Sequence, residues 1–158
     1  MIIFDKADLK SQEGMERAFR HYFRWMREEN DGTFNAMLGG EFVSCDYEKK
    51  TALIAMETQD WMTNPSRIVH GGITASILDF TMGLLARYCT TGYMTPTVSM
   101  SVEYLRPMPL GKTVYVEAAV TMAGFSVCHV TARCWAEGSP EKLIATSSGA
   151  YYVTRRPD

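Results

Sequence analysis

The chain has 158 residues, 46% of them hydrophobic and 22% charged, a length and composition typical of one globular domain and not of a disordered or collagen-like chain. With 16 Lys and Arg against 18 Asp and Glu, it lacks the basic excess that holds a phosphate backbone, so we expect no nucleic-acid partner. It shows neither the apolar segment of a secretory signal nor a run long enough to span a membrane. We therefore expect a cytoplasmic protein without a membrane partner.

The four cysteines and three histidines are scattered along the chain. They form neither the Cys-x-x-Cys pairs nor the His/Cys clusters of metal and redox sites. We therefore expect no metal, and cysteines that serve as reduced, small hydrophobic residues.

The first predicted element is an amphipathic helix over residues 11–29, whose apolar side chains recur at helical spacing and which Asn30, Asp31 and Gly32 end. Two strands follow at 41–47 and 51–56, around a charged turn. From Gly72 to Cys89 the chain is apolar on nearly every side, which predicts a buried helix.

Four alternating segments follow, at 97–105, 114–122, 128–134 and 144–153, and they predict four strands. The short connections leave no room for crossover helices, so the strands should pair antiparallel. The pattern predicts a single α+β domain over 1–158, with a sheet of about six antiparallel strands wrapped around one long central helix and an extra N-terminal helix.

Asp79 lies in the middle of the apolar helix, where burial of an unpaired charge costs several kcal/mol. A salt bridge to Arg87, a hydrogen bond to nearby backbone, or exposure on a narrow polar stripe would each explain it structurally. Arg87 is about 12 Å away along the helix axis, too far for a local pair. The functional hypothesis is that Asp79 is a general base or a nucleophile.

His70, Gly71 and Gly72 stand where this helix begins. Its first N–H groups and its dipole can polarise a carbonyl oxygen, and the glycines let a substrate approach the backbone. Asp79 lies up to about 12 Å along the helix from these groups, so one chain would keep the acid and the N–H groups apart. A site shared between two copies of the chain would bring them together.

Residues 64–79, with the sequence NPSRIVHGGITASILD, resemble the signature of hotdog-fold acyl-CoA thioesterases of the phenylacetate-degradation type, in the 4HBT-like superfamily. The stretch TVSMSVEYLRP at 97–107, followed by Gly111 and Gly124, extends the resemblance over about 36–153. The resemblance implies the hotdog fold, with residues 11–29 as an addition to it.

The resemblance also implies roles for individual residues. Asp79 would activate water or attack the thioester carbonyl, Asn64 and the Gly71 N–H would polarise that carbonyl, and His70 would help to position it. Thr97 matches a hydroxyl residue that orients the water. The segments that would contact CoA contain Gly72, Tyr104, Arg106, Pro107, Gly124, Phe125 and Ser126. Arg106 is either a phosphate contact or a solvated surface residue, and His129 and Arg133 remain structural or peripheral.

The implied activity is hydrolysis of an acyl-CoA thioester to a carboxylic acid and CoA, in a homodimer or homotetramer with sites across the dimer interface. Hydrolysis needs a base, a water and an oxyanion donor, so no cofactor is expected beyond the CoA of the substrate. Two alternatives stay open: a hotdog acyl-thioester hydratase or dehydratase, and a non-catalytic acyl-CoA-binding module. The many Met and aromatic residues fit either an apolar acyl pocket or the core.

Overall fold

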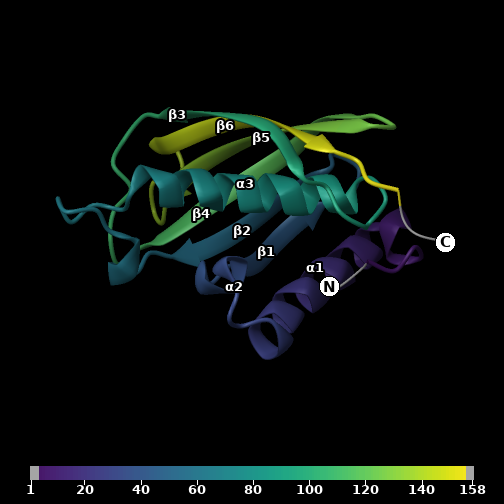
Figure 1. The fold of residues 1–158 in the computed structure, drawn as a ribbon, viewed down its shortest axis with the longest axis horizontal. Coiled ribbons are helices and arrows are strands. Elements are labelled where there is room, and N and C mark those ends of the chain that lie inside the picture. Colours follow the sequence, from purple (N-terminus) through teal and green to yellow (C-terminus); the bar gives the residue numbers. More distant parts are fainter. Residues whose placement is uncertain (1–3, 156–158) are drawn as a thin grey trace.

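The computed structural model describes residues 4–155 and shows one antiparallel sheet curved around a long helix (Figure 1). The strands are β1 Glu41–Asp46, β2 Thr51–Glu57, β3 Thr97–Tyr104, β4 Thr113–Ala123, β5 Val127–Ala136 and β6 Leu143–Tyr152. The helices are α1 Gln12–Glu29, α2 Phe34–Met37 and α3 Gly71–Tyr88, with short 3₁₀ turns η1 Asp8–Lys10 and η2 Asp60–Met62.

The six strands lie in the order β1-β2-β4-β5-β6-β3, and all neighbours run antiparallel. The central helix α3 lies across the concave face, and α1 lies outside it against β1 (Figure 1). The architecture that the sequence predicts is therefore confirmed. The N-terminal helix α1 and the central helix α3 begin and end within one residue of their predicted bounds.

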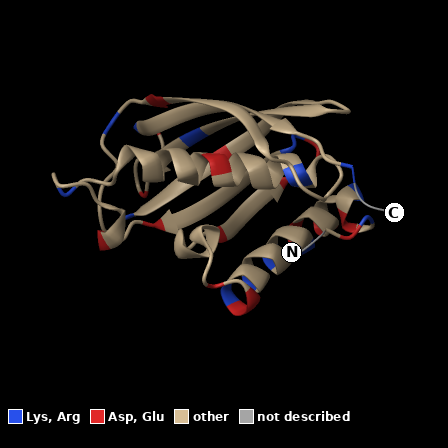
Figure 2. Ribbon diagram, viewed as in Figure 1, with Lys and Arg blue, Asp and Glu red and all other residues tan. Residues whose placement is uncertain are grey.

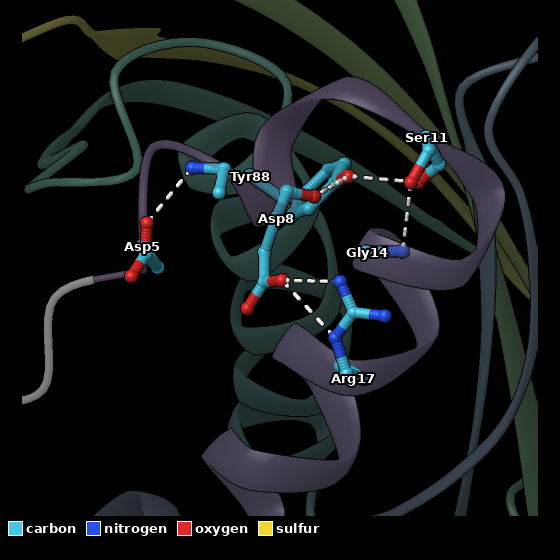
Figure 3. A network of polar contacts seen from close by, with 7 residues as sticks. Asp5, Asp8, Ser11, Gly14, Arg17 and Tyr88 are labelled. Atoms are coloured by element: carbon cyan, nitrogen blue, oxygen red, sulfur yellow. Dashed lines mark hydrogen bonds and ion pairs between the residues drawn. The ribbon is translucent and has the colours of Figure 1, made fainter.

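Polar contacts attach α1 to the C-terminal end of α3 (Figure 3). The Ser11 hydroxyl caps α1 by accepting from the Gly14 N–H at 3.1 Å. The Asp8 carboxylate accepts from the Arg17 guanidinium at 2.8 Å, and the Tyr88 hydroxyl donates to the Asp8 carbonyl at 2.6 Å. Since Tyr88 belongs to α3, these bonds fix where the aromatic face of α1 meets the central helix.

One side of α3 is less buried than the sequence suggests. The side toward the sheet is fully buried, with Ile77, Leu78, Met82 and Leu85 at 0% exposure. Ser76, Asp79, Gly83 and Arg87 are only half-buried, and they form what we call the open stripe. The prediction of a helix buried nearly all round was wrong on this side, because the open stripe faces a cavity.

The strand β5 shows the predicted alternation, with buried Cys128 and Val130 on one face and exposed His129 and Arg133 on the other. The strand β3 alternates in sequence, but on its apolar face only Met100 and Val102 are half-buried, and Val98 is 61% exposed. This difference arises because β3 is an edge strand, with β6 on one side only. Within the described ranges, no helix is both long and apolar enough to cross a membrane.

Candidate active site

Two hydroxyl groups from different strands orient the Asp79 carboxylate. The Thr97 hydroxyl on β3 donates to Asp79 Oδ1 at 2.8 Å, and the Tyr151 hydroxyl on β6 donates to the same oxygen at 3.0 Å. Among residues 4–155, Oδ2 has no hydrogen-bond partner, so the carboxylate presents one oxygen for chemistry.

Tyr151 is a component of this site that the sequence analysis missed. Its side chain is fully buried, and burial raises its pKa, as does the adjacent Asp79 charge, so the hydroxyl remains a protonated donor. Tyr151 lies 72 positions from Asp79 in the chain. The only signal in the sequence was its place in an alternating strand, which indicated a core residue and not a site residue. Thr97 acts on the carboxylate itself, whereas the resemblance implied that it orients the water.

A cavity of about 270 Å³ opens beside Asp79 along the open stripe of α3. Aromatic side chains from three helices form part of its wall: Tyr22 of α1, Phe34 of α2 and Phe80 of α3. The N-terminal helices thus contribute directly to the surroundings of the acid. In the described part of the chain, no group of three or more His, Cys, Asp or Glu residues is placed to hold a metal ion.

The start of α3 forms a second cluster. His70 is the N-cap, and its Nδ1 accepts from the Gly72 N–H at 2.8 Å, so this nitrogen does not carry the ring proton. In the described structure the Gly71 N–H has no acceptor. The Tyr104 hydroxyl donates to the Gly71 carbonyl at 3.0 Å and places its ring beside this glycine. The Gly71 N–H is thus available to a ligand.

A short antiparallel pairing brings the segment of Asn64 next to the residues that precede α3: the Asn64 N–H bonds to the Ile68 carbonyl, and the His70 N–H bonds to the Met62 carbonyl. The Asn64 Oδ1 accepts from the Ser66 N–H at 2.9 Å and from the Ile68 N–H at 3.4 Å. Asn64 therefore caps a turn through its oxygen. Within residues 4–155 its Nδ2 has no partner, so the same side chain can cap the turn and donate to a ligand.

A single chain keeps the acid and the donor groups apart. Asp79 contacts Thr97 at the start of β3, whereas Gly71 contacts Tyr104 at the end of that strand. The separation along α3 is about 12 Å. This geometry agrees with the expectation that one chain does not bring the two groups to the same carbonyl.

The residues expected to contact CoA also lie in two groups. Tyr104, Arg106 and Pro107 lie near the start of α3, where Arg106 Nη1 donates to the Leu143 carbonyl at 2.7 Å. Arg106 thus has a structural partner at the start of β6.

The second group, Gly124, Phe125 and Ser126, forms the β4–β5 turn and lines a cavity of about 300 Å³ beside Thr90. Since Thr90 follows the end of α3, this group lies at the opposite end of the helix. Phe125 is 80% exposed, with the Arg155 guanidinium 5.4 Å from its ring centre. A side chain at Gly124 would collide with the Val127 carbonyl, so glycine is also needed for the turn.

Comparison with known proteins finds similarity to thioesterases. The family model described as the thioesterase superfamily matches residues 67–142. An acyl-coenzyme A thioesterase, THEM4 of Xenopus laevis, is 27% identical over 97 residues, which cover 61% of this chain and 42% of that protein. The match thus spans less than half of this relative's length.

Solved structures share the fold over most of their length. Zebrafish thioesterase superfamily member 2 superposes with a TM-score of 0.75 at 21% identity, covering 87% of this chain and 97% of that one. A phenylacetic acid degradation-related protein of Ralstonia eutropha gives a TM-score of 0.70 at 25% identity, covering 84% and 99%. The sheet and central helix are those of hotdog-type thioesterases.

Proposed function

Because residues 67–142 match the thioesterase superfamily model, we propose that this chain is an acyl-CoA thioesterase, which hydrolyses acyl-CoA to a carboxylic acid and CoA. The observation that carries the proposal is the Asp79 carboxylate, which Thr97 and Tyr151 orient beside a cavity and which keeps one oxygen free. The likeness to an acyl-coenzyme A thioesterase supports CoA as the thiol of the substrate.

In the proposed reaction, Asp79 Oδ2 takes a proton from water while the water oxygen bonds to the thioester carbon. The negative charge that develops on the carbonyl oxygen is stabilised by the Gly71 N–H and the Asn64 amide of a second copy of the chain. The carbon–sulfur bond then breaks, and the CoA sulfur takes the proton from Asp79. No bound metal or cofactor enters these steps.

Direct attack by Asp79 Oδ2 would instead form an acyl anhydride that water then hydrolyses. A single turnover in ¹⁸O-labelled water tests for a covalent path in which water attacks the Asp79 carbonyl of the anhydride. We expect the label in the acid product, as water activation requires. Label in the Asp79 carboxylate would establish the covalent path.

Thiol release from a panel of acyl-CoAs tests the proposed function. We expect release with at least one acyl-CoA, whereas hydration or binding alone would release no thiol. The protein's own thiols should react slowly, because burial raises the pKa of Cys89 and of Cys134 to about 12. Protein without substrate gives the background, and a panel without any thiol release would refute hydrolysis.

Asn64→Asp should lower turnover more than Asn64→Ala, with little change in melting temperature. Aspartate keeps the oxygen that caps the turn but replaces the amide donor with a negative charge beside the oxyanion. Loss of one oxyanion donor typically costs about 10²–10³ in turnover. Asn64→Ala should reduce both turnover and melting temperature, because it removes cap and donor together.

Kinetics and thermal unfolding of both variants test this assignment. Wild-type turnover in Asn64→Asp, together with destabilisation in Asn64→Ala, would show that Asn64 only stabilises the turn and does not take part in the reaction.

Tyr151→Phe should lower kcat about tenfold, since a hydrogen bond to a charged group contributes about 1.5–3 kcal/mol. Tyr115→Phe, on the far side of the sheet from α3, is the matched control. An unchanged kcat in a folded Tyr151→Phe variant would show that Tyr151 only packs.

A further inference from the structure

We propose that Gly83 of α3 and Gly149 of β6 are positioning residues for catalysis, because together they form a slot that holds the Tyr151 ring with its hydroxyl on Asp79. This role rests on the proposed thioesterase function and extends it to the groups that set the geometry of the catalytic carboxylate. It derives from the contacts that a methyl group would make at either glycine.

Hydroxyl groups, and not a positive charge, orient the Asp79 carboxylate. Within residues 4–155, Asp79 takes part in no ion pair. The only other charged residue of α3 is Arg87, about 12 Å away along the helix axis, and β6 carries no charge (Figure 2). The direction of the carboxylate therefore depends on the Thr97 and Tyr151 hydroxyls, at 2.8 and 3.0 Å from Oδ1. A displaced Tyr151 ring would remove one of these two bonds.

Gly149 lies against the hydroxyl end of the Tyr151 ring. The two residues are two positions apart on β6, so they face the same side of the sheet. A Cβ at position 149 would lie 3.0 Å from Tyr151 Cε2 and 3.2 Å from its hydroxyl oxygen. Carbon atoms in contact prefer a separation of about 3.5–4.0 Å. Because Gly149 pairs with Val130 of β5 and Met100 of β3, the strand is held on both sides, and an added methyl group would push the hydroxyl end of the ring away.

Gly83 lies against the opposite edge of the same ring. It follows Asp79 by one turn on the same side of α3. A Cβ at position 83 would lie 3.3 Å from Tyr151 Cε1 and 3.8 Å from Cδ1. The Gly83 carbonyl accepts from the Thr95 hydroxyl at 3.0 Å, which holds this turn of the helix in place. The ring thus lies between the two glycines, with its hydroxyl at the preceding turn of α3, where Asp79 lies.

Both glycines occupy places in which glycine is unfavourable. Inside a helix or a strand, glycine is less stable than alanine because its backbone loses more freedom on folding. Gly83 lies inside α3 and Gly149 inside β6, and neither has a positive φ. Backbone conformation therefore does not require glycine at either position. The buried Tyr151 ring provides the reason, since it occupies the space that a side chain would need at both.

The structural alternative is that the two glycines only let β6 pack closely on α3. An added methyl group would then lower stability, and any loss of turnover would not depend on the Tyr151 hydroxyl. A double-mutant cycle with Tyr151→Phe separates the two roles, because phenylalanine keeps the ring and removes only the hydroxyl. The measurements are kcat and KM for the acyl-CoA that is hydrolysed fastest, and the melting temperature.

Gly149→Ala should lower kcat about tenfold in otherwise wild-type protein, as loss of the Tyr151 hydroxyl does, and should change KM less than about twofold. In Tyr151→Phe protein the same substitution should change kcat less than about twofold, because the hydroxyl that it displaces is already absent. It should lower the melting temperature in both backgrounds, since the ring is present in both. Gly32→Ala is the control, because its methyl group meets nothing within 4 Å, and it should keep the wild-type kcat.

Gly83→Ala is a second and independent variant. Alanine is favoured over glycine in a helix, so the melting temperature should not fall. Its contact with the ring is looser, at 3.3 Å, so kcat should fall by a factor between about two and ten. This loss should also disappear in Tyr151→Phe protein. If Gly149→Ala does not fold, Gly83→Ala decides by the same criteria.

Wild-type kcat in a folded Gly149→Ala variant would overturn the inference, as would an equal loss of kcat with and without the Tyr151 hydroxyl. Wild-type kcat in Tyr151→Phe would overturn it as well, since the slot would then position nothing. In each of these cases, thiol release by the wild type still supports the thioesterase function. A wild type that releases thiol from no acyl-CoA would refute that function itself.

Discussion

Asp79→Asn is expected to lower kcat by about a hundredfold or more while leaving the fold intact. Asparagine has the same shape, and its carbonyl oxygen still accepts from Thr97 and Tyr151. It cannot take a proton from water, and loss of a general base typically costs about 10²–10⁴ in rate. The variant thus removes the catalytic base without changing how the side chain packs.

Asp79→Ala is the companion variant, and it should lose activity to a similar extent and stability as well. It removes the nearer acceptor of the buried Tyr151 hydroxyl and leaves the Asp79 carbonyl at 3.4 Å, and loss of a hydrogen bond to a charged group costs about 1.5–3 kcal/mol. Thiol release and thermal unfolding are measured for both, with Asp31→Asn in an exposed loop as the control. Wild-type turnover in folded Asp79→Asn protein would remove Asp79 from the mechanism.

Two inactive variants should restore activity when they share a dimer. If Asp79 of one copy works with Asn64 of the other, a hybrid of Asp79→Asn and Asn64→Asp chains contains one site with both native residues. Random exchange makes half of the dimers hybrid, each with one of two sites intact, so recovery should approach about a quarter of wild-type activity. Sites within single chains would recover nothing, because every site would carry a substitution.

Hybrids carrying two different affinity tags can be purified and assayed directly. Each variant taken through the same exchange alone provides the control, and sedimentation gives the size of the assembly. Verified hybrids without recovery would contradict the shared site, as would a fully active monomer.

Sequence periodicity alone determined the six strands and the two long helices of this protein, but not the short α2 or the two 3₁₀ turns. Alternation with a period of two marked the strands, and a nearly continuous apolar run marked α3, because each pattern records which side of an element faces the core. Short connections then determined that the strands pair antiparallel. The acid Asp79 and the glycines at the start of α3 could also be identified from the sequence, because they interrupt its apolar pattern locally.

Only the tertiary structure decided which residues meet at Asp79. A period of two says which face a side chain occupies but not which strand lies beside it, and the order β5-β6-β3 brings Thr97 and Tyr151 to one oxygen. Likewise, α3 has an open stripe because α1 and α2 leave a cavity beside it. Contacts between residues 72 positions apart depend on how the whole sheet closes around the helix, and no local pattern in the chain records that packing.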